Sequence, residues 1–195
     1  NLLLNEFVEA DLMNGKGRAY GVEFQVKKNY GALTGWVSYT LARTERQVEG
    51  INNGLWYPTR FDRLHNLNIT AAYQVSNRVS FSGNFVFNSG TPATFPTNRI
   101  ETNGWIIPHN SEDRRNNYRI PDYHRLDISV TLQQKQKANK KREGNWVFSL
   151  YNVYNRQNPF AVFFQPNKDN AQKTEAINYS IIGSVIPGVT YNFKF

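Results

Sequence analysis

Residues 66–88 read NLNITAAYQVSNRVSFSGNFVFN, and this stretch decides the fold. In each half, apolar and polar residues alternate, which is the pattern of a β-strand with one apolar and one polar face. Ser76 and Asn77 lie between the halves and are typical of a tight turn. The apolar positions are Leu67, Ile69, Ala71, Tyr73 and Val75 in the first half, and Val79, Phe81, Gly83, Phe85 and Phe87 in the second. The sequence therefore predicts an antiparallel hairpin with strands of about ten residues.

The same period of two recurs along most of the chain, and no helical period competes with it. It predicts seven strands in all, and the sixth can continue past Leu150, bent near Pro159, through Phe164. The other five strands are predicted near 20–27, 33–41, 125–133, 146–150 and 187–195. Short connections are predicted at about 29–31, 76–77 and 135–145, and long ones at about 1–16, 45–60, 89–122 and 166–177. Because short and long connections alternate, we expect them at opposite ends of an up-and-down sheet.

Composition excludes several classes of protein. The chain has 195 residues, 39% of them hydrophobic, and no cysteine, which excludes a disulfide scaffold and a thiolate metal site. No run of about 18 apolar residues predicts a transmembrane helix. The first residues lack the pattern of a signal peptide, and we expect a fragment or a processed piece of a longer protein. The net charge is +8, but no nucleic-acid-binding motif accompanies the basic turn at 135–142, so we expect no nucleic-acid partner.

Two all-β architectures are compatible with the alternation. In a soluble sandwich the apolar faces meet inside, whereas in a transmembrane barrel they face lipid and the polar faces line the lumen. Strand length, loop asymmetry, dense polar rows and 14% aromatic residues favour the barrel. Seven strands do not close a bacterial barrel, for which even numbers from eight upward are the rule. We therefore expect the remaining strands on another chain or on a preceding N-terminal segment.

Five stretches carry a resemblance to a known family. They are GKGRAYGVEFQVKKNYGALTGWVSYTLARTE (15–45), NNGLWYPTRFDRLHNLNI (52–69), RIPDYHRLDISVTL (119–132), SLYNVYNRQNPF (149–160) and IPGVTYNFKF (186–195). In this order and spacing the chain resembles the C-terminal third or quarter of TonB-dependent outer-membrane receptors. The most similar subgroup carries a carboxypeptidase-regulatory-like domain before its plug. The resemblance implies that residues 1–195 are strands 16 to 22 of a 22-stranded barrel in the bacterial outer membrane.

The resemblance also implies a function and partners. Receptors of this family use proton-motive force, relayed by TonB, to take up a scarce ligand such as an iron chelate, cobalamin, a glycan or a peptide. The implied partners are the N-terminal strands and plug of the same receptor, the TonB complex, outer-membrane lipid and lipopolysaccharide, and the β-barrel assembly machinery. A surface lipoprotein is a further candidate partner. A structural barrel without transport, serving as a partner in an outer-membrane assembly, and a soluble β-sandwich that binds carbohydrate remain as alternatives.

Aromatic and charged residues near the predicted loops are candidate site residues. Trp56, Tyr57 and Trp105 fall in long loops and suit stacking on a ligand, although packing of loop on loop is the alternative. Residues with the parity of the polar face, expected to face the lumen or plug, are Arg60, Asp62, Arg125 and Asp127. Arg63, His65 and His124 have the opposite parity, near the external end, where lipopolysaccharide phosphates lie. The resemblance implies that Tyr191, Phe193 and Phe195 form the C-terminal signal for barrel assembly.

We expect no enzymatic activity, no cofactor and no metal site. His124 and Asp127 are three residues apart, and so are Asp62 and His65, which puts each pair on opposite faces of a strand. No nucleophile elbow, phosphate loop or metal-binding spacing accompanies them.

Overall fold

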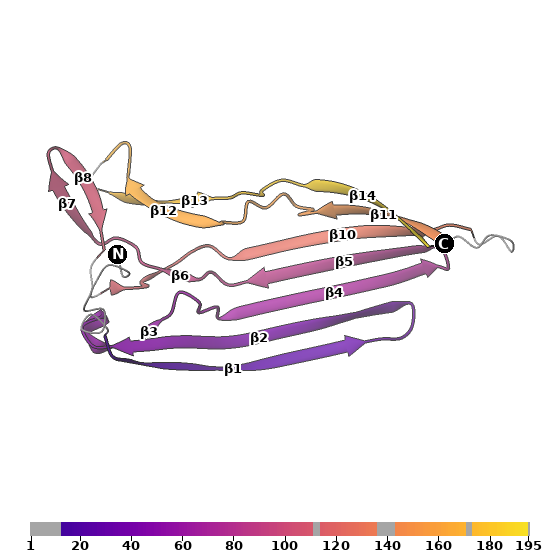
Figure 1. Cartoon of the computed structure of the whole chain (residues 1–195), viewed down its shortest axis with the longest axis horizontal. Coiled ribbons are helices and arrows are strands. Elements are labelled where there is room, and N and C mark those ends of the chain that lie inside the picture. The colour runs from indigo at the N-terminus through magenta and orange to yellow at the C-terminus, as the bar shows by residue number, and fades with distance from the viewer. Residues whose placement is uncertain (1–12, 111–113, 136–142, 171–172, 195) are drawn as a thin grey trace.

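The computed structural model describes residues 13–110, 114–135, 143–170 and 173–194. Its main feature is an eight-stranded antiparallel sheet (Figure 1). Seven strands lie side by side in chain order: β1 (Gly15–Lys28), β2 (Leu33–Val48), β4 (His65–Ser76), β5 (Val79–Asn88), β10 (Tyr123–Gln133), β11 (Glu143–Tyr151) and β14 (Ile186–Lys194). The short β3 (Tyr57–Pro58) pairs with the end of β2. The predicted all-β class and antiparallel order are confirmed, and the sheet is not closed, because β1 and β14 each pair on one side.

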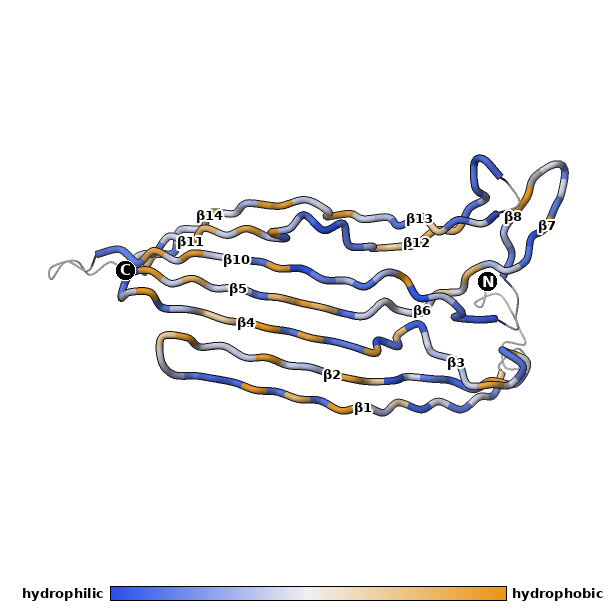
Figure 2. Tube along the Cα trace, turned by 180° about the vertical axis from the view of Figure 1, so that it is seen from behind, coloured by the Kyte–Doolittle hydropathy of each residue, from blue (hydrophilic) through white to orange (hydrophobic). Residues whose placement is uncertain are grey.

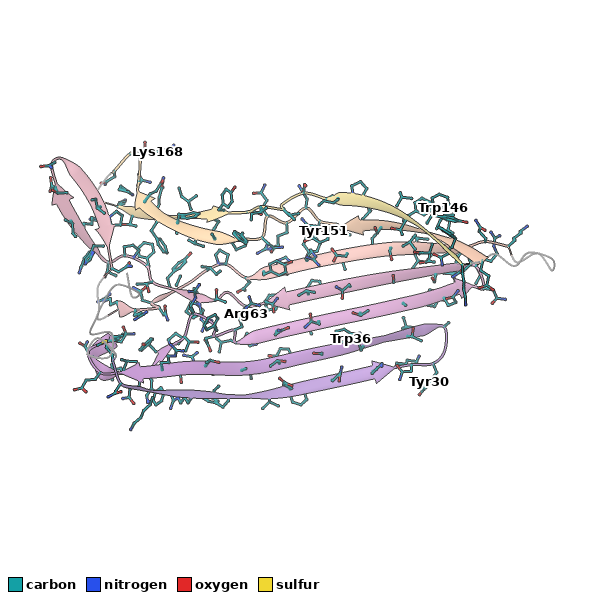
Figure 3. All side chains as sticks on the ribbon, in the orientation of Figure 1. Tyr30, Trp36, Arg63, Trp146, Tyr151 and Lys168 are labelled. Atoms are coloured by element: carbon teal, nitrogen blue, oxygen red, sulfur yellow. The ribbon has the colours of Figure 1, made fainter. Side chains whose placement is uncertain are left out.

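Connections differ in length at the two ends of the sheet. Figure 1 shows the tight turns after β1 and β4 at the same end as the C-terminus, with the long connections at the opposite, loop end. Figure 3 shows Tyr30 and Trp146 toward the tight-turn end, whereas Arg63 and Lys168 lie toward the loop end. Three small two-stranded sheets form within the long connections, together with the 3₁₀ turn η3 (Asn52–Gly54). They pair β6 (Pro92–Ala93) with β9 (Tyr118–Arg119), β7 (Asn98–Thr102) with β8 (Trp105–His109), and β12 (Ala161–Pro166) with β13 (Thr174–Tyr179).

The sixth strand stops earlier than the sequence pattern indicates. β11 ends at Tyr151, and Asn152 adopts a left-handed backbone with φ 55°. The Asn152 side chain is 1% exposed, donates to the Arg156 carbonyl at 3.0 Å and accepts from the Arg156 N–H at 3.0 Å. This asparagine-centred turn takes the chain out of the main sheet. The apolar run 161–164 therefore pairs with β13 instead of extending β11.

Cross-strand register gathers the apolar side chains on one face of the sheet. One row of direct partners crosses five strands and contains Val26, Val37, Ile69, Phe85 and Leu126. A second row, nearer the tight turns, contains Tyr73, Phe81, Val130, Phe148 and Val189. Figure 2 shows the resulting alternation of hydrophobic and hydrophilic positions along each strand.

Polar side chains pair in the same way on the opposite face. Thr70 donates to the Asn84 side chain at 2.9 Å, and the hydroxyls of Ser82 and Ser129 lie 2.7 Å apart. Since each row has like partners on neighbouring strands, a slip of one residue would put apolar side chains on the polar face. The register is therefore specified by side-chain polarity as well as by the turns.

Burial is inverted relative to a water-soluble domain. Tyr57 is the one buried hydrophobic residue in the described part of the chain, and the most deeply buried side chains there are those of Asp62 and Asn152. On the apolar face, Val26 is 72% exposed and Val189 63% exposed. No helix within the described ranges is long and apolar enough to cross a membrane.

Candidate ligand pocket at the loop end

A cavity of about 550 Å³ lies at the loop end of β2. Its polar lining consists of Arg46, Thr59, Arg60, Thr94, Arg115 and Asn116, and its apolar lining consists of Met13, Val48, Ile51, Tyr57, Phe61, Pro92 and Ala93. Arg46 is an even number of residues from Trp36 and Thr70 is the direct partner of Trp36, so Arg46 belongs to the polar face. The cavity is therefore continuous with the polar side of the sheet, at its loop end.

Hydrogen bonds between distant segments shape this pocket. Asn52 and Arg115 bond reciprocally: the Asn52 side chain donates to the Arg115 carbonyl at 3.0 Å, and the Arg115 N–H donates back at 2.6 Å. The Asn116 side chain donates to the Pro58 carbonyl at 2.7 Å, and its N–H donates to the Thr94 hydroxyl at 3.1 Å. These bonds hold the β2–β4 connection and the β5–β10 connection around one cavity.

A buried ion pair joins the loop segments next to the pocket. Asp62 is fully shielded from solvent, forms an ion pair with Arg119 of β9, and accepts the Thr44 N–H at 2.6 Å. Arg119 also donates to the carbonyl of Gly90 at 2.8 Å. The Gly90 N–H in turn donates to the Asp122 carboxylate at 2.8 Å. The charge of Asp62 is thus compensated within this network, which ties β2 to both ends of the segment 90–122.

The arginines that line the pocket have no such ion pair with the part of the chain that the structure describes. Arg46, Arg60 and Arg115 are exposed, and none of them forms an ion pair with another described residue. No Asp or Glu is among the lining residues that the structure describes. Arg60 lies over the ring of Phe61, with 5.5 Å between the guanidinium carbon and the ring centroid. A guanidinium group presents a planar fork of donors that matches carboxylate and phosphate, so the pocket is suited to anions.

Trp56 lies on the opposite side of the sheet from the pocket. Consecutive residues of a strand point to opposite faces, and Tyr57 is paired with Arg46. The guanidinium of Arg18 lies 4.2 Å from the Trp56 ring centroid and pairs with Glu45 at 2.7 Å. Glu45 is 7% exposed and also pairs with Arg43, at 3.1 Å. This charged cluster continues the apolar face beyond its last apolar row.

The three predicted ligand residues, Trp56, Tyr57 and Trp105, therefore do not share one site. Tyr57 lines the pocket from a buried position, with 6% of its surface exposed, whereas Trp56 packs against Arg18 on the other face. Trp105 begins β8, in the small hairpin with β7. Contact of these three residues with a ligand remains a prediction.

The four charged residues predicted on the polar face do not form one row. Arg60 lines the pocket and Asp62 lies buried beneath it. Arg125 donates to Asp127 at 3.0 Å, and its guanidinium carbon lies 4.1 Å from the ring centroid of Tyr151, whose hydroxyl accepts at 2.7 Å. Contact with a plug remains a prediction for all four.

His65 and His124 lie on the apolar face near its loop end. His65 stacks on Tyr39, with the Tyr39 hydroxyl 2.8 Å from His65 Nδ1, and His124 stacks on Phe87. Tyr154 places its hydroxyl 2.8 Å from His124 Nδ1. Burial raises the pKa of the Tyr154 phenol above its ordinary value. Arg63, which is exposed, has no ion-pair partner among the described residues.

A second aromatic cluster lies near the tight-turn end of the apolar face. The rings of Trp146 and Tyr191 are 4.7 Å apart between centroids, and those of Tyr191 and Phe193 are 6.0 Å apart. Phe195, the last residue of the predicted assembly signal, lies outside the described residues. The assembly role of this segment remains a prediction.

Sequence reasoning did not anticipate two arginines of the pocket, nor Arg119 of the ion pair beside it. Arg46 follows the predicted end of its strand at Leu41, and the alternation could have been extended to it, because β2 continues to Val48. Arg115 and Arg119 had no local pattern to indicate them, since their partners lie more than fifty residues away.

Comparisons with known proteins add no family assignment. No family model matches the chain, and no curated protein or solved structure is significantly similar to it. Within the described ranges, no group of three or more His, Asp or Glu side chains gathers in a way that could hold a metal ion.

Proposed function

We propose that this chain is part of the wall of a bacterial outer-membrane β-barrel, and specifically of a TonB-dependent receptor that takes up a scarce ligand. In this proposal the apolar face contacts lipid, the polar face lines the lumen, and the loop end is external. The observation that carries the proposal is the inverted burial. The apolar face that extends over the whole main sheet is half-buried on the central strands and exposed on the edge strands, while carboxylate and amide side chains are the most deeply buried. Such a face needs an apolar environment, since large exposed apolar patches mark contact surfaces.

The height of the apolar face supports a bilayer as that environment. On β10, apolar-face positions run from His124 to Leu132, which is eight residue steps. At about 3.4 Å per step the face is about 27 Å long, and a tilt of about 40° reduces it to roughly 21 Å. The apolar band of outer-membrane barrels is about 25 Å tall.

Aromatic clusters at both limits of this face agree with the same interpretation. The Trp146–Tyr191 pair lies toward the tight turns, and the Tyr39–His65 and Phe87–His124 pairs lie toward the loops. Barrels carry aromatic girdles at both membrane interfaces, where a ring with a polar edge is favoured.

Two further features favour a receptor over the alternatives. The unpaired edges of β1 and β14 would leave backbone donors and acceptors in lipid, so this interpretation requires additional strands to complete the wall. The arginine-lined pocket opens on the polar side at the loop end, where a ligand would enter a barrel lumen. A purely structural barrel has no need of such a pocket.

Adjacent residues on opposite faces provide a direct test. This chain has no cysteine, so Phe85→Cys and Asn84→Cys each introduce a single thiol into it. In the full-length receptor that contains this chain, any cysteine outside these residues is first replaced by serine. Phe85 is paired with Ile69 and Leu126 on the apolar face, and Asn84 with Thr70 and Asp127 on the polar face.

In vesicles, we expect brominated lipid to quench a fluorophore at position 85 and to leave the one at position 84 unquenched. A membrane-impermeant maleimide should react more readily at position 84. If lipid quenches neither label and the protein fractionates with the aqueous phase, the barrel proposal is wrong and a soluble β-sandwich is favoured.

A further inference from the structure

We infer that the pocket at the loop end binds a ligand that carries at least two carboxylate or phosphate groups attached to an apolar part. This inference rests on the proposed function, because it concerns the ligand that the receptor takes up from its external side. It narrows the ligand from any scarce solute to a multiply charged anion.

The charge of the pocket is the first argument. Three guanidinium groups line one cavity, and none has an ion-pair partner in the described part of the chain. Two described carboxylates near the cavity are already engaged: Asp62 pairs with Arg119, and Glu45 pairs with Arg18 and Arg43 on the other side of the sheet. Glu49 follows the lining residue Val48, but it is exposed and is not among the described residues that line the cavity. Like charges gathered in a concave site raise the local concentration of ions of opposite sign. An anion from outside this network would therefore be attracted to the cavity.

The arrangement of the arginines is the second argument. Arg46 comes from β2, Arg60 from the segment after β3, and Arg115 from the segment before β9, so the three approach the cavity from different elements. A single carboxylate is satisfied by one or two guanidinium forks. Three such groups match a ligand with more than one anionic group.

The size and the apolar wall of the cavity complete the description. A volume of about 550 Å³ is within the range of small-molecule sites and far exceeds the volume of one phosphate or carboxylate. Val48, Ile51 and Phe61 contribute apolar side chains to the same lining. The ligand class that fits all three properties is a small amphiphilic polyanion.

Binding of citrate and pyrophosphate to the full-length receptor tests this inference. The receptor is purified in detergent free of lipopolysaccharide, and isothermal titration calorimetry compares the two anions with maltose, which is uncharged. We expect both anions to bind, with an affinity that falls as NaCl is raised, and maltose not to bind at this site. Added lipopolysaccharide should not displace citrate, since the pocket opens on the polar face. Displacement would identify a lipid phosphate as the occupant of the pocket and would overturn the inference that the pocket binds a ligand for uptake.

Variants of the three arginines localise the binding. Arg46→Gln, Arg60→Gln and Arg115→Gln should each weaken citrate binding about tenfold, which is typical for loss of one charge-assisted hydrogen bond. The triple variant should lose measurable binding. Arg99→Gln is the matched control, because Arg99 is exposed in β7 and has no ion pair with another described residue. Retained heat-modifiable gel mobility shows that a variant is assembled.

The outcomes separate this inference from the proposed function. If neither anion binds at millimolar concentration, or if assembled arginine variants bind like the natural protein, the inference is overturned. Lipid quenching at position 85 without anion binding would support the barrel proposal and refute the inference that the ligand is a polyanion. Should the triple variant fail to assemble, the single variants of these exposed side chains decide the question.

Discussion

Removal of the Asp62 carboxylate is expected to release the loop end of the sheet. This side chain is fully shielded and holds two partners, the N–H of Thr44 in β2 and the guanidinium of Arg119 in β9. Asp62→Ala leaves the Thr44 donor without an acceptor and the Arg119 charge without a counter-ion. The segment around Asp62 then loses one of its bonds to β2, although the pairing of β3 with β2 remains, and the segment around Arg119 loses its ion pair.

The loss of stability expected for Asp62→Ala depends on how far Arg119 is exposed to water. Removing one member of a buried ion pair costs about 3–5 kcal/mol. The Arg119 side chain is 32% exposed and can regain water, so we expect the lower end, about 3 kcal/mol. Asp62→Asn keeps an acceptor for the Thr44 N–H and should recover about 1 kcal/mol of that loss.

Hydrogen–deuterium exchange of the full-length receptor measures this local stability. A loss of about 3 kcal/mol corresponds to roughly a hundredfold faster exchange of the Thr44 amide and of the segment 59–64 in Asp62→Ala. Asp169→Ala is the control, because Asp169 is an exposed carboxylate without an ion pair among the described residues. Unchanged protection in Asp62→Ala, or an equal loss in the Asp169 control, would show that the buried pair does not hold the loops.

Two further substitutions test the face assignment and the backbone packing. Ile69→Arg, at mid-height of the apolar face, should destabilise the barrel by about 2–4 kcal/mol and reduce the heat-modifiable fraction. Asn68→Arg on the polar face should still assemble. An equal loss of the heat-modifiable fraction in both variants would contradict the assignment of the two faces. Gly90→Ala should lower the amount of assembled receptor, because a methyl group there would overlap the Ile120 carbonyl oxygen. The control is Gly17→Ala, where the atom nearest to the added methyl group, the Glu45 carbonyl oxygen, is 3.9 Å away. Wild-type yield of Gly90→Ala would refute the close packing of these two segments.

Local alternation was sufficient to predict much of the sheet. The stretch 66–88 gave both strands and the turn of one hairpin, and the structure pairs Leu67 with Phe87 and Ile69 with Phe85 as that alternation requires. The prediction was less accurate at strand ends. β2 extends past Leu41 to Val48, because its polar continuation still pairs with β1 although the apolar alternation has stopped.

The sixth strand shows why a continuous apolar pattern can mislead. The run 161–164 has the composition of a strand, but the buried Asn152 and its bonds to Arg156 turn the chain out of the main sheet first. A side chain that bonds its own backbone competes with the sheet, and the outcome depends on tertiary contacts. The long segment 89–122 likewise contains short paired strands that its polar composition did not indicate.

The sequence by itself determined the period, the polarity of each face and the alternation of short and long connections, because these properties depend on neighbours one or two residues apart. Only the tertiary structure brought Arg46, Arg60 and Arg115 to one cavity and paired Asp62 with Arg119, 57 positions further along the chain. Such contacts depend on how separate loops meet at one end of the sheet, and nothing local in the sequence specifies that meeting. The physical reason is that strand faces follow from backbone geometry, whereas a pocket built from loops follows from hydrogen bonds and ion pairs that form after the strands are in register.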